Sequence, residues 1–236
     1  GSTCGECEPC RGGRERYCAR QSNCGFSVDG ALSTHAVVPS QHLVRVPAPL
    51  DASEAAPLCC AGWTAYAAVR EAALPAGRTL AIFGLGGLGH LAIQYARHRG
   101  LRVAAVDPVE EKLDQARSLG ADVAATVLRK EHGLADAALV LTANPAAIQQ
   151  AFRSLQRTST LILVGLATAN FELPLVEAVL KGIRIHTSYL GTREDLEEVF
   201  RLPIRPHVTT HAIEEAPALL DRLARGQVKG RAVIRF

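Results

Sequence analysis

Residues 79–90 read TLAIFGLGGLGH, an uncharged apolar run that leads into a cluster of glycines. The first five residues favour a buried strand, and residues 87–99 repeat apolar side chains at helical spacing. The pattern G-x-G-x-x-G at residues 84–89 therefore lies between a strand and a helix. This context predicts a dinucleotide-binding turn, although the glycine pattern alone also occurs in turns that bind no ligand.

Each glycine of this turn has an expected task. Gly84 permits a tight turn, Gly86 lets the backbone approach a pyrophosphate, and Gly89 lets the helix pack close to the strand. The free N–H groups at the helix N-terminus would face the pyrophosphate. Gly87 and Leu88 complete the turn, so all five residues are candidate coenzyme-binding positions.

Asp107 follows the next apolar run, 23 residues after Gly84. A carboxylate there accepts hydrogen bonds from both hydroxyls of an adenosine ribose and repels a 2′-phosphate. The next residues are Pro108 and Val109 rather than an arginine, which favours NAD over NADP. An aspartate in this place also caps the following helix, and the two roles are compatible.

Apolar runs alternate with helical patterns through the middle of the chain. This alternation predicts an α/β fold with a doubly wound parallel sheet. Residues 30–58, with four prolines, are expected to form short strands and turns, and residues 196–236 a helix with short strands. The connection between residues 127 and 138 leaves room for only a turn or two of helix. The predicted strands are residues 79–83, 102–106, 123–127, 138–142, 160–164 and 183–188, and the clearest helices are residues 87–99 and 109–119.

Cys4, Cys7, Cys10 and Cys18 are spaced C-x2-C-x2-C-x7-C. Four thiolates suit a tetrahedral zinc ion without an open position, and the loop has almost no apolar residues that could replace the metal. The pattern therefore predicts a structural zinc site. Disulfides suit a secreted domain rather than a dinucleotide-binding enzyme, and an iron–sulfur cluster is the remaining chemical alternative.

The charge distribution argues against nucleic acid and membrane partners. The net charge is +3, and the N-terminal arginines are diluted by glutamates, as in a solvated face. The uncharged residues 79–96 contain glycines, a histidine and a glutamine, which a bilayer span does not normally carry. No signal peptide is visible. A cytoplasmic location is expected because the cysteine pattern suits a reducing compartment. Methionine is absent, and we expect the natural chain to begin upstream of residue 1.

The motifs together resemble one family. A four-cysteine lobe, APLCCAG at residues 56–62 and GLGGLGH at residues 84–90 are similar to the zinc-containing medium-chain alcohol dehydrogenases, in particular their propanol-preferring and yeast-like branch. VDGALSTHAVV at residues 28–38, GTR at 191–193 and KGR at 229–231 extend the resemblance over essentially the whole chain.

This resemblance implies a Rossmann domain at residues 59–195. Residues 1–58 and 196–236 would form a partial GroES-like catalytic domain, with the zinc lobe at residues 1–26. It also implies NAD-dependent interconversion of small-molecule alcohols with aldehydes or ketones, and a homodimer or homotetramer built through the Rossmann domains. The alcohol itself is not specified by these motifs.

Further site residues follow from the resemblance alone. Cys60 matches the third protein ligand of the catalytic zinc, whereas Cys59 is expected to be a buried structural thiol. Thr64 matches a position beside the nicotinamide, and Gly165 and Leu166 match the backbone groups at the same end of the coenzyme. The remaining matches are Lys112 with Asp107 at the adenosine ribose, and Arg231 at the pyrophosphate.

The family places its other catalytic zinc ligands and its proton-relay hydroxyl upstream of the cysteine lobe, and this chain lacks them. We therefore expect the chain alone to hold structural zinc and to bind NAD weakly, without turnover. His207 and His211 do not replace the missing ligands, because the residues between them favour a strand that separates their side chains. His90 is expected to pack or cap at the helix start.

Two other functions remain open, and two more are disfavoured. A zinc-dependent polyol or threonine dehydrogenase shares these motifs, and a non-catalytic NAD-binding fragment fits the missing zinc ligands. A zinc-free quinone reductase is disfavoured by the cysteines. A zinc-ribbon nucleic-acid binder has no use for the glycine turn.

Overall fold

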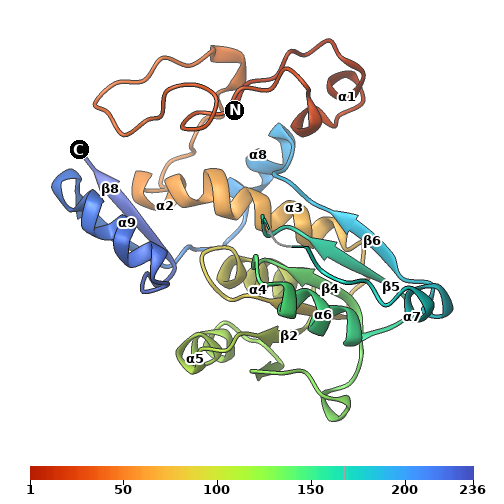
Figure 1. Ribbon diagram of the computed structural model, residues 1–236. Helices are drawn as coiled ribbons and strands as arrows, with labels where there is room; N and C mark the ends of the chain where they lie inside the picture. The colour runs from red at the N-terminus through yellow and green to blue at the C-terminus, as the bar shows by residue number, and fades with distance from the viewer. Residues whose placement is uncertain (167, 169) are drawn as a thin grey trace.

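The computed structural model describes residues 1–166, 168 and 170–236. Its centre is a six-stranded sheet in which every strand pair is parallel and the strand order is β3-β2-β1-β4-β5-β6 (Figure 1). This is the predicted doubly wound sheet, with β1 and β4 side by side where the order reverses. The strands are β1 (Thr79–Phe83), β2 (Arg102–Val106), β3 (Val123–Ala125), β4 (Ala135–Val140), β5 (Leu155–Leu163) and β6 (Arg184–Thr187).

Helices cover both faces of this sheet because successive strand residues point to opposite sides. Along β1, Leu80 and Ile82 pack with the helices of one face, and Ala81 and Phe83 with those of the other. The first face carries α2 (Ala52–Pro57), the π-helical turn η3 (Leu58–Gly62), α3 (Trp63–Glu71), α4 (Gly89–His98), α5 (Glu110–Ser118) and α8 (Arg193–Arg201). The second face carries α6 (Pro145–Arg153) and α7 (Leu175–Lys181).

Two predicted strand boundaries were wrong by several residues. β4 begins at Ala135 rather than at residue 138. The strand can include the polar residue Asp136 because its carboxylate accepts a hydrogen bond from the N–H of Thr79 at 2.8 Å. β5 begins at Leu155 rather than at 160, and it contains Thr158 at φ 61. The short connection before β4 holds only the 3-10 turn η4 (Lys130–His132), as predicted.

The predicted strands in residues 30–58 are absent. This stretch contains only the 3-10 turn η2 (Ser40–His42) and the start of the helical layer at α2. A strand needs a partner for its backbone groups, and no strand of the described chain pairs with this stretch. Leu32 and Val37 are accordingly exposed.

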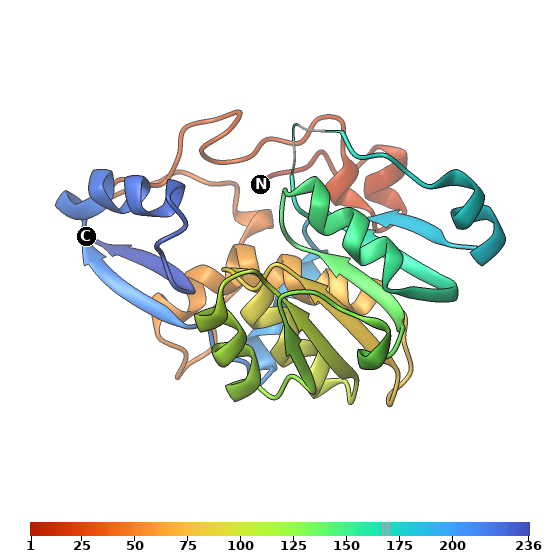
Figure 2. The same ribbon diagram turned by 60° about the horizontal axis from the view of Figure 1, so that its bottom comes forward.

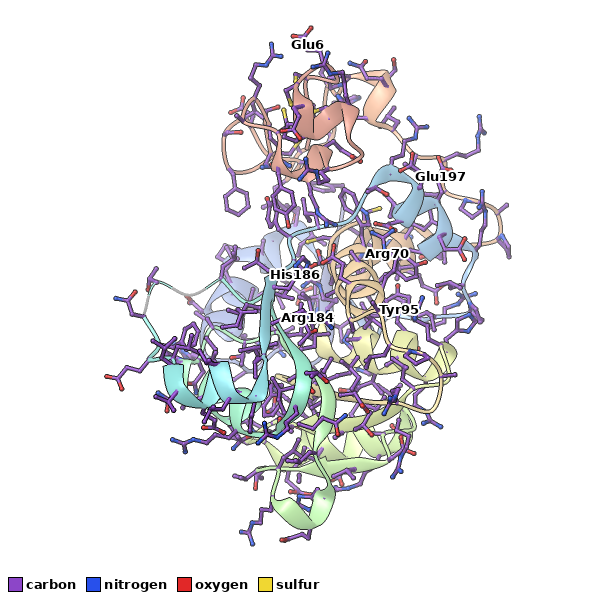
Figure 3. The ribbon with its side chains drawn as sticks, turned by 90° about the vertical axis from the view of Figure 1, so that its right-hand side faces the viewer. Glu6, Arg70, Tyr95, Arg184, His186 and Glu197 are labelled. Carbon is purple, nitrogen blue, oxygen red and sulfur yellow. The ribbon has the colours of Figure 1, made fainter. Side chains whose placement is uncertain are left out.

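The cysteine lobe folds around α1 (Glu8–Arg11) and the 3-10 turn η1 (Glu15–Tyr17). It docks on the sheet domain through an ion pair of Arg16 with Glu71 and through the Tyr17 hydroxyl, which donates to the carbonyl of Thr187 at 3.3 Å. In Figure 3 its sulfur atoms gather at the top of the molecule, with Glu6 at the outer end. Arg16 is thus buried at an interface, which corrects its expected place on a solvated face.

The C-terminal unit consists of β7 (Val208–Ala212), the 3-10 turn η5 (Ile213–Glu215), α9 (Ala216–Ala224) and β8 (Arg231–Arg235). β7 and β8 form a separate parallel pair. This unit lies on the side of the molecule opposite α7 in both Figure 1 and Figure 2. No helix among the described residues combines the length and apolar character needed to cross a membrane.

Candidate functional site

The glycine turn lies at the carboxyl end of β1, where the sheet order reverses. Gly84 has φ 93, a conformation that favours glycine, and a Cβ there would lie 3.0 Å from Thr142 Cβ. A Cβ at Gly89 would collide with the carbonyl of Gly84, so the helix packs against the turn as predicted. A Cβ at Gly86 would meet nothing within 4 Å, which leaves this part of the backbone open to a ligand.

The N-terminus of α4 lies behind the turn. Leu88 is the N-cap residue of α4 and supplies no side-chain cap, and the N–H groups of His90 and Leu91 donate to the carbonyls of Gly86 and Leu88. The positive end of a helix dipole attracts anions. The open backbone at Gly86 and this helix end together suit a pyrophosphate.

Asp107 is a buried carboxylate at the carboxyl end of β2, with 4% of its surface exposed. Oδ2 accepts the N–H of Leu85 at 2.9 Å, and Oδ1 accepts the N–H of Val109 at 3.1 Å. Lys112 Nζ lies 3.6 Å from Oδ2. The carboxylate therefore braces the glycine turn and the start of α5, and each oxygen keeps a second lone pair for a ligand hydroxyl.

A cavity of about 300 Å³ opens beside this carboxylate. It lies over the carboxyl ends of β1, β2 and β4, the place where doubly wound sheets bind their ligands. Its lining includes Gly84, Asp107, Lys112, Thr142 and Asn144. The structure thus brings together the glycine turn and the two expected ribose contacts.

Arg231 lies against the glycine turn from the C-terminal unit. A Cβ on Gly87 would lie 2.9 Å from Arg231 Cδ, so only glycine leaves room for the arginine at this point. The residue begins β8, more than a hundred residues away along the chain. The guanidinium therefore lies beside the turn, and the role of Arg231 at a pyrophosphate stays a prediction.

The residues expected at the nicotinamide end lie in the first turn of α3 and just after β5. The Thr64 hydroxyl donates to the carbonyl of Cys60 at 2.7 Å. Gly165 follows β5, and a Cβ there would collide with the carbonyl of Thr142. Leu166, which comes next, is 79% exposed. Thr142 was not predicted, because a lone threonine at a strand end carries no sequence signal for the two glycines that pack on it.

Cys59 and Cys60 are both exposed, so the expected burial of Cys59 was wrong. In the π-helical turn η3, Leu58, Ala61 and Gly62 take the buried side, which turns the two thiols outward. Among the described residues, Cys60 belongs to no group of three or more side chains that could share a metal ion. Cys60 alone is therefore a single ligand rather than a zinc site.

The lobe cysteines do converge. The sulfurs of Cys4, Cys7, Cys10 and Cys18 all lie within 4.8 Å of one another. Neighbouring pairs are 3.4 to 3.8 Å apart, which matches the roughly 3.8 Å between sulfurs of a tetrahedron with bonds of about 2.3 Å. The cysteines are unbridged, and the donor set fits zinc.

Hydrogen bonds within the lobe shift the pKa values of two thiols in opposite directions. Backbone N–H groups of Glu6 and Cys7 lower the pKa of the Cys4 thiol to about 6, whereas hydrogen bonds among the sulfurs outweigh the backbone N–H of Cys10 and raise the pKa of the Cys7 thiol to about 12. Around the cluster, Arg14 pairs with Glu8 at 2.5 Å and Arg20 with Glu6 at 2.6 Å. These pairs hold the outer arginines at the solvated surface, as expected.

The three histidines considered in the sequence analysis lie in or beside α4 and β7. His207 and His211 flank residues that form β7, and neither belongs to a metal-ligating group in the described part of the chain. His211 instead lies 3.1 Å from the carboxylate of Glu215. His90 is buried at the start of α4.

Comparisons with known proteins agree with this geometry. The family model described as "Zinc-binding dehydrogenase" matches residues 87–204. An alcohol dehydrogenase of Geobacillus stearothermophilus is 39% identical, and the match covers 100% of this chain and 73% of the relative. An alcohol dehydrogenase of Rhizobium meliloti is 37% identical over 99% of this chain and 72% of its own length.

Solved structures show the same relationship. The alcohol dehydrogenase of the archaeon Aeropyrum pernix superposes with a TM-score of 0.89 at 30% identity, covering 98% of this chain and 73% of that one. Acetophenone reductase from Geotrichum candidum, in complex with NAD, has a TM-score of 0.92 at 29% identity, covering 98% and 70%. Because a relative named alcohol dehydrogenase is 39% identical over the whole chain and the zinc-binding dehydrogenase model matches residues 87–204, the chain belongs to the zinc-binding alcohol dehydrogenase family.

Proposed function

We propose that this protein is an NAD-dependent alcohol oxidoreductase that interconverts an alcohol with its aldehyde or ketone. The observation that carries the proposal is Asp107, a buried carboxylate at the carboxyl end of β2 that faces the cavity beside the glycine turn. Its oxygens retain lone pairs for the two ribose hydroxyls, and its charge repels a 2′-phosphate. The coenzyme is therefore NAD rather than NADP.

The coenzyme spans the carboxyl edge of the sheet. Its adenosine ribose lies against Asp107 and Lys112, and its pyrophosphate lies over Gly86 and the N-terminus of α4 with Arg231 beside it. Gly87, Leu88 and Gly89 shape that turn. The nicotinamide end is directed towards Thr64, Gly165 and Leu166. These assignments are supported by the cavity at the sheet edge and by the contact of Arg231 with Gly87.

Two kinds of zinc site belong to the proposed enzyme. Cys4, Cys7, Cys10 and Cys18 hold a structural zinc, because four thiolates leave no position for a substrate. Cys60 contributes one ligand to a catalytic zinc, which requires further ligands beyond those that the described residues bring together. When bound, a catalytic zinc would supply a Lewis acid for the alcohol oxygen, and NAD would supply the hydride acceptor.

The domain boundaries follow from the same proposal. Residues 59–195 form the coenzyme domain, with residues 1–58 and 196–236 as the partial GroES-like catalytic unit. A homodimer or homotetramer is supported by the exposed edge strand β6 and by apolar side chains on α7 such as Leu175 and Val179. A cytoplasmic location is supported by the unbridged cysteines. The substrate is a small-molecule alcohol.

A non-catalytic NAD-binding protein is the second candidate. The isolated position of Cys60 among the described residues favours it, since one thiolate does not retain a catalytic zinc. A polyol or threonine dehydrogenase remains a variant of the first proposal with another substrate.

Native mass spectrometry together with an activity assay separates the two candidates. This chain and the gene product extended upstream of residue 1 are each loaded with zinc, their bound metal is counted, and NAD-dependent ethanol oxidation is followed by NADH absorbance. One zinc in this chain, with two zinc ions and turnover in the extended product, supports the enzyme. One zinc, NADH binding and no turnover of ethanol, a secondary alcohol or a polyol in the extended product support the non-catalytic candidate.

A further inference from the structure

His90 links the glycine turn to the C-terminal unit. The side chain lies in the first turn of α4 and is 1% exposed. Its Nδ1 lies 3.1 Å from the carbonyl oxygen of Gly86, and its Nε2 lies 3.1 Å from the backbone nitrogen of His207, the residue before β7. The ring therefore joins two segments that are more than a hundred residues apart in the sequence.

These two contacts define the protonation state of the ring. A backbone N–H only donates, so Nε2 must accept the bond from His207, and the single ring proton must reside on Nδ1 and be donated to Gly86. A second proton, on Nε2, would place two N–H donors face to face, those of His90 and His207. Burial lowers the pKa of His90, and the nearby His207 and Arg231 lower it further, which keeps the ring neutral.

The contacts continue from His207 to Arg231. The N–H of Arg231 donates to the carbonyl of His207 at 2.9 Å. Gly230, between them, has φ 61, and a Cβ there would collide with that carbonyl. The side chain of Arg231 then returns to Gly87 in the glycine turn. These contacts thus form a closed series, referred to below as the circuit. It leads from Gly86 through His90, His207 and Arg231 back to the neighbouring Gly87.

We propose that His90 is a positioning residue for the coenzyme pyrophosphate, which it serves by holding Arg231 over the glycine turn through the backbone of His207. The inference rests on the proposed function, since it requires that the turn binds a dinucleotide. A residue that merely packs at the helix start needs only the bond within its own turn to Gly86. The second bond, across to the C-terminal unit, is what ties the arginine to the loop.

Two substitutions of His90 separate the two bonds. His90→Asn places an amide where Nδ1 lies and keeps only the bond to Gly86, whereas His90→Gln extends an oxygen to the Nε2 position and keeps the bond from His207. His98→Asn is the matched control, because this histidine is exposed at the other end of the same helix. NADH affinity of the full chain is measured by fluorescence titration.

We expect the Kd for NADH to rise about tenfold in His90→Asn, as for the loss of one buried hydrogen bond, and to stay within about threefold of wild type in His90→Gln. His98→Asn leaves it unchanged. In an Arg231→Gln background the difference between His90→Asn and His90→Gln disappears, because the arginine that the histidine positions is gone.

The wild-type NADH affinity also falls as the pH drops through the pKa of His90, and His90→Gln removes this loss. The titratable and charged groups that face the ring are His207 at the start of β7 and Arg231 on β8. Neither group is changed in His90→Gln, so the difference between the two pH profiles belongs to His90.

Amide hydrogen exchange without coenzyme tests the circuit itself. The amide of His207 exchanges faster in His90→Asn than in His90→Gln. Equal exchange in the two variants, or equal NADH affinity in His90→Asn and His98→Asn, overturns the inference. Failure of the wild-type chain to bind NADH at all overturns the proposed function instead, and the positioning role with it.

Discussion

Thr158 has φ 61, a left-handed conformation that is unfavourable for a β-branched residue. The side chain is exposed, and its hydroxyl only donates to the carbonyl of the preceding Arg157. This one hydrogen bond does not compensate for the backbone strain, which is about 1–3 kcal/mol for a residue of this kind. At this position in β5 the backbone conformation therefore disfavours the residue that the sequence supplies.

Thr158→Gly is expected to raise the free energy of unfolding by about 1 kcal/mol, because glycine adopts positive φ without steric cost but loses more entropy on folding. Urea denaturation at constant protein concentration measures the change. Thr158→Ala keeps a Cβ at the same φ and serves as the control, with a change below about 0.5 kcal/mol. A less stable glycine variant would show that the threonine side chain makes a stabilising contact.

At the scale of single elements, α8 is attached to the coenzyme domain at its first turn. Thr192 and Asp195 form a capping box, in which the N–H of Thr192 donates to Asp195 Oδ2 at 2.8 Å. The other oxygen of Asp195 pairs with Arg70 of α3, and the Trp63 indole N–H donates to the carbonyl of Thr192 at 2.6 Å. Figure 3 shows Arg70 at this junction.

Asp195→Ala removes both the cap and the ion pair of a carboxylate that is only 3% exposed. We expect a loss of about 2–3 kcal/mol in the free energy of unfolding, below the full cost of a broken buried pair because Arg70 is partly exposed and regains water. Glu197→Ala on the same helix breaks only an exposed pair with Arg193 and should cost less than about 0.5 kcal/mol. Equal effects of the two substitutions in urea denaturation would refute the role given to the capping box.

We expect the cysteine lobe to depend on metal rather than on a core, since Cys18 is its one buried apolar side chain among residues 1–26. Cys10→Ser should therefore reduce the zinc content from one ion per chain to none, and residues 1–26 should become the first site of proteolytic cleavage. Cys24→Ser changes an exposed cysteine outside the cluster and should keep the zinc. Elemental analysis and limited proteolysis give the result, and a Cys10→Ser protein that retains a full zinc ion would contradict the assignment.

The elements that the sequence predicted well are those whose signal is local. β1 and β2 were predicted to the residue, because an apolar run buried on both faces needs no knowledge of its partners. The start of β4 was missed, since the hydrogen bond that accommodates Asp136 comes from Thr79, far away in the sequence. The prediction of strands in residues 30–58 was wrong for a related reason, because a strand forms only where another strand pairs with it.

The candidate site divides in the same way. The glycine turn and Asp107 lie within one strand–helix–strand unit, so their spacing alone predicted that they meet. Thr142 contacts two glycines, and His207 contacts His90. These contacts join segments that are distant in the sequence, so no local sequence pattern predicts them. Arg231 could be placed from the resemblance but not from spacing.

At the scale of the whole molecule, polar links join the cysteine lobe and the C-terminal unit to the part of the chain that contains the six-stranded sheet. Arg16 with Glu71 connects the lobe to α3, and His90 with His207 connects α4 to the C-terminal unit. Figure 2 shows the C-terminal unit beside the sheet rather than in it. Stability should therefore respond to the protonation of the linking groups.

The His90 link predicts lower stability in acid. In the unfolded chain the ring takes up a proton near its ordinary pKa of 6.5, whereas burial lowers the pKa in the folded chain. Below about pH 6.5 the unfolded state thus binds more protons, and the free energy of unfolding falls as the pH falls. Between about pH 7.5 and pH 5.5, wild type should lose up to about 1.4 kcal/mol more than His90→Gln in urea denaturation. Identical losses would mean that His90 titrates equally in both states.

Coenzyme selection by Asp107 is the central claim of this account, and parallel fluorescence titrations of the chain with NADH and with NADPH test it most directly. The account predicts that NADH binds at least about tenfold more tightly than NADPH, and that Asp107→Ser narrows this difference by removing the charge that repels the 2′-phosphate. Equal affinities in the wild-type chain, or tighter binding of NADPH, would contradict it.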